Sequence, residues 1–155
     1  CISGNGIPLD AYKVDYASGA VEEMVLKYKN NEYLIIEGQG SLLNPGSTAT
    51  LPLMRGSCPT ALVLCHRLGL RVVESETKIL IPPLEQVISL NEQLVTGLNS
   101  FPTAKVKAVA LDTRGYDHAS AINEISKMED KLNLPVTDPV RFSAKKIANA
   151  LIYNK

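Results

Sequence analysis

The chain has 155 residues, 45% of them hydrophobic, so it is long enough to bury the core of one soluble domain. Sixteen Lys and Arg residues balance sixteen Asp and Glu residues, and this zero formal charge argues against a nucleic-acid partner. No apolar run approaches the roughly 20 residues that a membrane span requires. We therefore expect a cytoplasmic protein that acts on a small-molecule substrate, without a nucleic-acid or membrane partner.

The first half of the chain begins with a helical pattern and continues with strand-like runs. From Pro8 onward, apolar residues recur at three- and four-residue steps, which predicts a helix with one apolar stripe. The members of that stripe are Val14, Ala17, Val21, Met24, Val25 and Tyr28. Residues 33–37 form a short apolar run that ends in a carboxylate and a glycine-rich turn, which is typical of a buried parallel strand. A second such run covers residues 61–65.

The second half alternates between helix and strand in the same way. Apolar spacing predicts helices over residues 84–98, 122–132 and 147–152, the last of them capped by Ser143. Residues 106–111 form a third strand-like run, and residues 134–136 a weaker one. This alternation predicts an α/β fold, a parallel sheet flanked by helices on both faces, in a single domain over residues 1–155.

Ligands of open parallel sheets bind where the strands deliver their carboxyl ends, so the residues after each run are candidates for a site. Glu37 follows the first run, and Gly38, Gln39, Gly40 and Ser41 follow Glu37. A carboxylate in this position can hold Mg²⁺ or accept a proton, and the glycines leave room for a ligand. The alternative interpretation is a turn in which Glu37 is solvated or caps a helix.

Polar residues also follow the second and third runs. His66 and Arg67 come after residues 61–65, where either side chain can meet a phosphate, although a histidine here is more often structural. Asp112, Thr113 and Arg114 come after residues 106–111, where many nucleotide-binding folds contact a base or ribose. The alternative for Arg114 is a surface ion pair.

The opening loop is a further candidate. Gly4, Asn5 and Gly6 precede the first helix, and a glycine-rich loop in that place can bind an anion. Asp10 lies near the predicted helix start, where a carboxylate is favoured even without a ligand. Asp15 lies beside the apolar stripe, so an inward-facing carboxylate is a further option.

Five blocks of the sequence resemble, in the right order, a bacterial family described as D-glutamate N-acetyltransferase-like. The blocks are residues 2–10, 36–43, 55–66, 111–115 and 134–141. The resemblance implies a P-loop NTPase-like domain of the dethiobiotin-synthetase type, preceded in the intact protein by a Rossmann-like domain. The family's Gly-x-x-x-x-Gly-Lys-Thr loop lies upstream of the first block and does not occur in this chain. We therefore expect the chain, which opens at Cys1, to be the post-P-loop part of such a domain.

Three functions are compatible with this resemblance. In the first, the intact protein moves acetyl from acetyl-CoA to D-glutamate, with Glu37, Asp15 or His66 as the base and Arg114 or Arg141 binding a substrate carboxylate. In the second, ATP and Mg²⁺ activate a carboxylate, with Glu37 and Asp10 near the metal. In the third, the chain alone is inactive because it lacks the phosphate-binding loop, and it associates with the missing N-terminal part of the same protein or with itself as a homo-oligomer.

Overall fold

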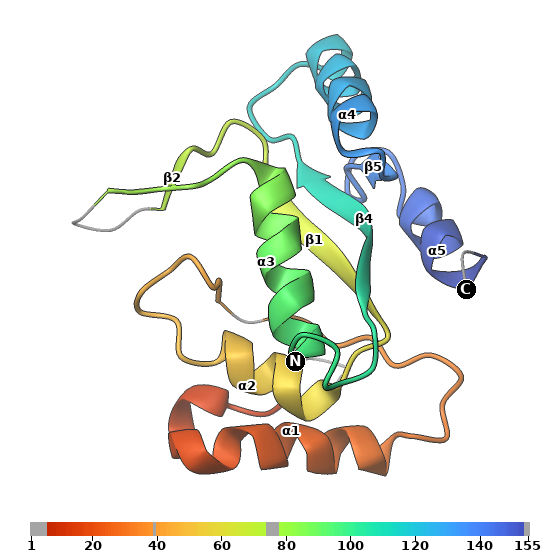
Figure 1. Ribbon diagram of the computed structural model, residues 1–155. Coiled ribbons are helices and arrows are strands. Elements are labelled where there is room, and N and C mark those ends of the chain that lie inside the picture. Colours follow the sequence, from red (N-terminus) through yellow and green to blue (C-terminus); the bar gives the residue numbers. More distant parts are fainter. Residues whose placement is uncertain (1–5, 39, 74–77, 154–155) are drawn as a thin grey trace. The chain divides into compact units, whose positions relative to one another are not determined.

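The computed structural model describes residues 6–38, 40–73 and 78–153 (Figure 1). In chain order the elements are η1 (Leu9–Ala11), α1 (Val14–Lys27), α2 (Thr50–Ser57), β1 (Ala61–Arg67), β2 (Val72–Val73), β3 (Ile79–Leu80), α3 (Leu84–Thr96), β4 (Lys105–Asp112), α4 (His118–Leu132), β5 (Val136–Thr137) and α5 (Lys145–Ile152). From β1 onward the elements alternate between strand and helix, apart from the short β2–β3 pair.

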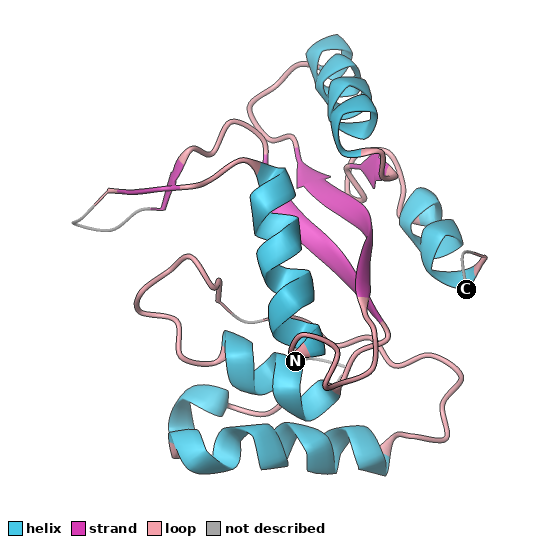
Figure 2. Ribbon diagram, in the orientation of Figure 1, coloured by secondary structure: helices cyan, strands magenta, loops and turns pink. Residues whose placement is uncertain are grey.

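Three strands form a parallel sheet in the order β1-β4-β5 (Figure 2). β4 is the central strand, and it pairs along its length with β1 and over two residues with β5. Four of its apolar residues are almost fully buried, as expected of a strand enclosed between neighbours and helices: Val106, Ala108, Val109 and Leu111. The predicted α/β fold with a parallel sheet flanked by helices is confirmed.

Helix α4 shows why the sequence forms these elements. Asp117 caps its start by accepting a hydrogen bond from Ser120 N at 2.9 Å, and Asn133 ends it in the left-handed conformation. Its apolar stripe includes Ile125, which forms one core cluster with Val109 and Leu111 of β4 and Val136 of β5. Helix α5 also packs against β4 and β5, so both helices hold the edge of the sheet where β5 lies. At α5, Ser143 Oγ accepts from Lys145 N at 3.1 Å and supports the helix start, although Ala144 is the N-cap.

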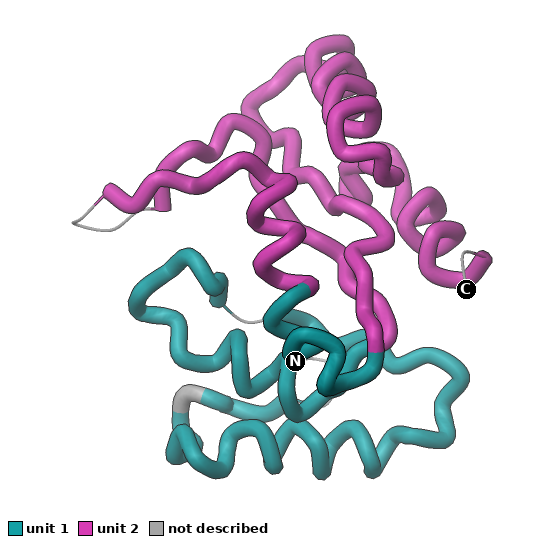
Figure 3. Tube along the Cα trace, in the orientation of Figure 1, with its two compact units in different colours: residues 1–59, 93–102 teal, residues 60–92, 103–155 magenta. Residues whose placement is uncertain are grey.

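Two compact units can be distinguished in the chain (Figure 3). Unit 1 comprises the described part of Cys1–Pro59 together with Gln93–Pro102, and unit 2 comprises the described part of Thr60–Glu92 and Thr103–Lys155. The parallel sheet, α4 and α5 belong to unit 2, whereas α1 and α2 belong to unit 1. That residues 1–155 form a single domain stays a prediction.

Unit 1 is built on the packing of α1 against α2. Its buried cluster is Leu9, Ala17, Val21 and Ala49. Gly56 of α2 permits the close approach, because a Cβ at this position would lie 2.2 Å from the backbone oxygen of Ser18 in α1. Helix α1 is shorter than predicted, since a separate 3-10 turn precedes it, and Val14 is 69% exposed rather than part of the buried stripe. Helix α2 was not predicted from the sequence.

The predicted strand over residues 33–37 is wrong. These residues have no regular secondary structure, and their side chains are exposed, Ile35 by 90%. Among the described residues, no backbone hydrogen bond joins Leu34, Ile35 or Ile36 to another segment. A β-strand needs a neighbouring strand to satisfy its backbone groups, and the described part of the chain supplies none here.

Candidate functional site

The carboxyl ends of β1 and β4 lie side by side at one edge of the sheet. His66 pairs with Leu111 and Arg67 with Asp112, and Leu68 N donates to Asp112 O at 2.9 Å just beyond the strands. Because the strands are parallel, the residues that follow them meet at this edge, which is where open α/β sheets bind ligands. The sequence candidates of the second and third runs are therefore brought together.

His66 is half-buried on the face of the sheet that carries the core. Leu64 and Leu68 flank it at two-residue spacing, and both pack against the cluster that contains its register partner Leu111. Since side chains alternate between the two faces of a strand, His66 points to that same face. Burial lowers the pKa of His66, so its imidazole is neutral near pH 7 and able to accept a proton.

Asp112 and Arg114 form an ion pair on the other face. Arg114 Nε donates to the two Asp112 carboxylate oxygens at 3.0 and 2.8 Å, and Nη2 donates to Oδ2 at 2.5 Å. These side-chain hydrogen bonds lower the pKa of Asp112 and raise the pKa of Arg114. The Arg114 side chain is 81% exposed, so the pair contributes little to stability.

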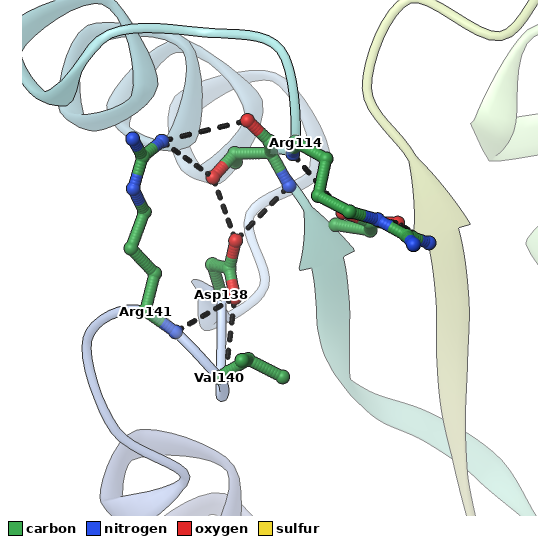
Figure 4. A network of polar contacts seen from close by, with 6 residues as sticks. Arg114, Asp138, Val140 and Arg141 are labelled. Atoms are coloured by element: carbon green, nitrogen blue, oxygen red, sulfur yellow. Dashed lines mark hydrogen bonds and ion pairs between the residues drawn. The ribbon is translucent and has the colours of Figure 1, made fainter.

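Asp138 is the centre of a polar network that the sequence did not reveal (Figure 4). Its Oδ2 accepts from Thr113 N at 3.0 Å and from Thr113 Oγ1 at 2.6 Å, while its Oδ1 accepts from Val140 N at 3.1 Å and Arg141 N at 3.0 Å. Burial alone would raise the pKa of Asp138, but the hydrogen bonds from Thr113, Arg141 and Val140 outweigh it and lower that pKa. The carboxylate is therefore ionised at neutral pH.

Arg141 contacts the loop after β4 through one end of its guanidinium. Nη1 donates to Thr113 Oγ1 at 3.2 Å and approaches Thr113 O at 3.4 Å. Figure 4 shows the guanidinium groups of Arg141 and Arg114 pointing away from each other. The prediction that either arginine binds a substrate carboxylate stays a prediction, but the two side chains are not arranged as one clamp.

The remaining candidates belong to unit 1. Glu37 is exposed in the irregular segment, and Asp15 is exposed in the first turn of α1 rather than inward-facing. Gly40 has a φ of 72°, which favours glycine, and Ser41 Oγ accepts from Leu43 N at 3.2 Å. Gly6 and Gly38 lie in irregular backbone, and Asp10 lies in η1. Gly4, Asn5 and Gln39 lie outside the described residues, as does the side chain of Asp10.

The second interpretation of the sequence involved a metal at Glu37 and Asp10. Within residues 6–38, 40–73 and 78–153, no group of three or more His, Cys, Asp and Glu side chains is placed to hold a metal ion. The metal role of Glu37 and Asp10 stays a prediction.

The role of Asp138 could have been suspected from one signal only. It comes two residues after the short run of residues 134–136 and precedes Pro139, so it sits where a strand ends. That position is the same one that drew attention to Glu37 and Asp112. Its partner Thr113 lies 25 residues away, and no spacing rule connects the two.

The fold and this edge define an α/β domain whose parallel sheet gathers ionisable side chains at its carboxyl end. The chain belongs to the DUF1611 family: the model of the DUF1611 domain of unknown function (DUF1611_C), a P-loop domain, matches residues 1–148. A solved structure of a DUF1611 family protein from Anabaena variabilis superposes with a TM-score of 0.93 at 48% identity, over 97% of this chain and 44% of that chain.

Two curated relatives carry a functional name. The D-glutamate N-acetyltransferase of Tritonibacter scottomollicae is 29% identical over 151 residues, and that of Pseudoalteromonas sp is 30% identical over 141 residues. These matches cover 97% and 90% of this chain but 45% and 42% of the relatives, so the chain spans less than half their length. The family resemblance drawn from the sequence is confirmed. No helix among the described residues is long and apolar enough to cross a membrane.

Proposed function

We propose that the intact protein is an N-acyltransferase that moves an acetyl group from acetyl-CoA to the amino group of D-glutamate. The observation that carries the proposal is the match of nearly the whole chain to two relatives named for this reaction. A second observation supports it: a neutral histidine and two arginines lie on the loops and strands at the carboxyl edge of the sheet. These are the residue types that proton removal and anion binding need.

In this proposal His66 is the general base. The incoming amine is an ammonium in solution, so it must lose a proton before its nitrogen attacks the thioester carbonyl of acetyl-CoA. A C–N bond then forms, the C–S bond breaks, and the thiolate of CoA leaves and takes up a proton. His66 suits the first step because burial lowers its pKa and keeps it neutral. Glu37 and Asp15, the other candidate bases, are exposed carboxylates in unit 1.

The acyl donor also carries phosphate groups that need cationic or N–H partners. In the proposal, the phosphate-binding loop expected in the intact protein holds them, and the cytoplasm supplies both substrates. ATP and Mg²⁺ in place of acetyl-CoA would make the protein a carboxylate-activating enzyme, and one experiment separates the two reactions.

The experiment uses the full-length protein. Acetyl-CoA and D-glutamate are supplied together, and release of the CoA thiol is followed alongside N-acetylglutamate by mass spectrometry. A parallel reaction supplies ATP, Mg²⁺ and a panel of carboxylic acids, and phosphate release is measured. Acetyl transfer without ATP consumption supports the proposal, whereas ATP hydrolysis that depends on an acid, with no acetyl transfer, contradicts it.

A further inference from the structure

Asp138 fixes the direction of the Thr113 hydroxyl. An ionised carboxylate only accepts hydrogen bonds, so the 2.6 Å contact requires Thr113 Oγ1 to donate its proton to Asp138 Oδ2. The oxygen of that hydroxyl is then left with lone pairs and no proton to give. Thr113 is fully buried, so no solvent-exposed rotamer competes with this arrangement.

The Thr113 hydroxyl in turn holds one end of Arg141. Its lone pairs face Nη1 of Arg141 at 3.2 Å, and Nη1 also approaches Thr113 O at 3.4 Å. The backbone nitrogen of Arg141 donates to Asp138 at 3.0 Å, which fixes the base of the same side chain. Arg141 is thus held at both its backbone and its Nη1 end.

The other edge of the Arg141 guanidinium is open. No hydrogen bond joins Nε or Nη2 to any residue that the structure describes, although these atoms carry three of the five N–H donors of the group. In Arg114 the equivalent Nε–Nη2 edge is occupied by the carboxylate of Asp112. The neighbouring ion pair shows that such an edge binds a carboxylate. It also shows that this edge of Arg114 is already occupied by Asp112.

The hydrogen bond to Thr113 brings the Arg141 guanidinium to the end of β4, the strand that pairs with β1 and His66. His66 and its register partner Leu111 point to the face that carries the core cluster of Leu111, and Asp112, the next residue of β4, points to the other face. Thr113 directly follows Asp112 and is fully buried.

We propose that Arg141 binds an oxyanion of one substrate, a carboxylate or a phosphate, through its open Nε–Nη2 edge, and that Asp138 is a positioning residue that acts through Thr113. This assignment rests on the proposed acyltransferase function, because the two anion-bearing substrates come from that reaction. It assigns the binding of a substrate oxyanion to Arg141 rather than to Arg114, the other arginine that the sequence suggested for this role.

The test is steady-state kinetics of the full-length protein with Arg141→Lys. Lysine keeps the charge but loses the planar two-donor edge, so the KM of one substrate should rise about tenfold or more. The KM of D-glutamate is measured at saturating acetyl-CoA, and the KM of acetyl-CoA at saturating D-glutamate. A rise in the first indicates that Arg141 binds the carboxylate, and a rise in the second that it binds a phosphate. Arg71→Lys changes another exposed arginine of unit 2; it is the matched control and should leave both KM values within about twofold.

The positioning role is tested with Asp138→Asn, Thr113→Ser and Thr113→Val. Asp138→Asn and Thr113→Val should raise the same KM as Arg141→Lys, and Thr113→Ser, which keeps the hydroxyl, should restore it. Combining Asp138→Asn with Arg141→Lys should add less than about twofold to the KM of Arg141→Lys alone. A purely structural role would instead lower kcat, or raise both KM values alike, without selecting one substrate, and would contradict the assignment.

The two proposals fail in different ways. If the wild-type protein transfers no acetyl group, the proposed function is wrong and the assignment of Arg141 falls with it. If the wild-type protein is active and Arg141→Lys changes neither KM, the function stands and only the assignment is overturned. If Asp138→Asn does not fold, Arg141→Lys still tests the binding of the oxyanion, because it changes an exposed side chain. The comparison of Thr113→Ser with Thr113→Val then still tests the positioning role.

Discussion

A single carboxylate oxygen of Asp138 accepts hydrogen bonds from both the backbone nitrogen and the hydroxyl of Thr113, at 3.0 and 2.6 Å. This contact joins the loop after β4 to the loop after β5, two strands that pair over only two residues each. The side chain of Asp138 therefore adds hydrogen bonds between these two segments beyond the end of β5, where the backbone pairing of the strands has stopped.

The first prediction concerns the pH dependence of stability. Hydrogen bonds to Asp138 outweigh its burial and lower its pKa in the folded state, so its ionised form contributes stability that is present above about pH 4 and lost as the pH falls through the folded value. Asp138→Asn should lower the free energy of unfolding by about 1–3 kcal/mol at neutral pH, because an amide cannot accept all four hydrogen bonds.

The measurement is urea denaturation of wild type and Asp138→Asn from about pH 7 down to about pH 3. The difference in free energy of unfolding between the two proteins should be largest at neutral pH and should decrease as the pH falls. Other carboxylates with lowered pKa values, such as Glu129 and Asp112, are common to both proteins and cancel in the difference. A gap that stays constant with pH would contradict the role given to the Asp138 charge.

The second prediction concerns the base. His66→Gln in the full-length protein should lower turnover about a hundredfold, since an amide keeps hydrogen bonding but cannot take up a proton. In the wild type, kcat/KM should rise with pH through a pKa below about 6.5, because burial lowers the pKa of His66. Above that pKa, His66 is fully in the neutral form that the reaction needs.

The other histidine of the chain is the matched control. His118 is exposed at the start of α4, where its ring meets the edge of Phe142 at 5.3 Å between centroids. His118→Gln should leave turnover within about twofold. An unchanged His66→Gln together with a loss of about tenfold or more in Glu37→Gln would transfer the role of base to Glu37.

The sequence predicted those elements whose side chains repeat over several turns or several strand positions. β1, β4, α3 and α4 each present a long enough pattern for the period to be read. Helix α2 was missed because it contains Pro52 and Gly56, which disfavour a helix, whereas the equally short α5 contains neither. β2 and β3 were missed because two residues show no period. The run over residues 33–37 has the composition of a strand, but composition does not report whether a partner strand is present.

The candidate site was likewise predicted only in part from the sequence. That His66 and Asp112 meet at one edge followed from the sequence, because parallel strands end together. The difference between Arg114 and Arg141 did not, since it depends on which guanidinium edge a neighbouring side chain already occupies. The ion pair of Arg114 is local to the end of β4, whereas the contact of Arg141 with Thr113 joins residues 28 apart in the sequence and is set by the tertiary structure.

The third prediction tests the packing of unit 1 with two glycines. Gly56→Ala would place a Cβ 2.2 Å from the backbone oxygen of Ser18 and 2.7 Å from the Cβ of Val21, so α1 and α2 must separate. The cost should be about 1–3 kcal/mol in the free energy of unfolding. Gly19 lies in α1 with open space around its Cβ position, so Gly19→Ala should stabilise the chain by about 0.5–1 kcal/mol.

Thermal denaturation followed by circular dichroism compares the two glycine variants. The expected result is a lower melting temperature for Gly56→Ala and a higher one for Gly19→Ala. Both substitutions add the same methyl group to a helix, so the difference between them reports the contact with Ser18 and Val21. Equal shifts in the same direction would show that α1 and α2 do not pack in this way.

The last prediction concerns Glu129, which connects α4, β5 and α5. Its Oε1 accepts from the backbone nitrogen of Val136 at 2.9 Å and from Lys146 Nζ at 2.8 Å. Val136 is fully buried, so Glu129→Ala leaves a buried N–H without its acceptor and should cost about 1–3 kcal/mol. Lys146→Ala removes only a partly exposed ion pair and should cost about 0–1 kcal/mol.

Glu129→Gln separates the two contributions, because its amide oxygen still accepts from Val136 N while the charge that attracts Lys146 is gone. Its cost, measured by urea denaturation, should therefore match that of Lys146→Ala rather than that of Glu129→Ala. The combination of Glu129→Gln with Lys146→Ala should add little to either change alone, since both remove the same ion pair. If Lys146→Ala instead destabilised the chain as much as Glu129→Ala, the ion pair would be the dominant interaction and the satisfied N–H of Val136 a minor one.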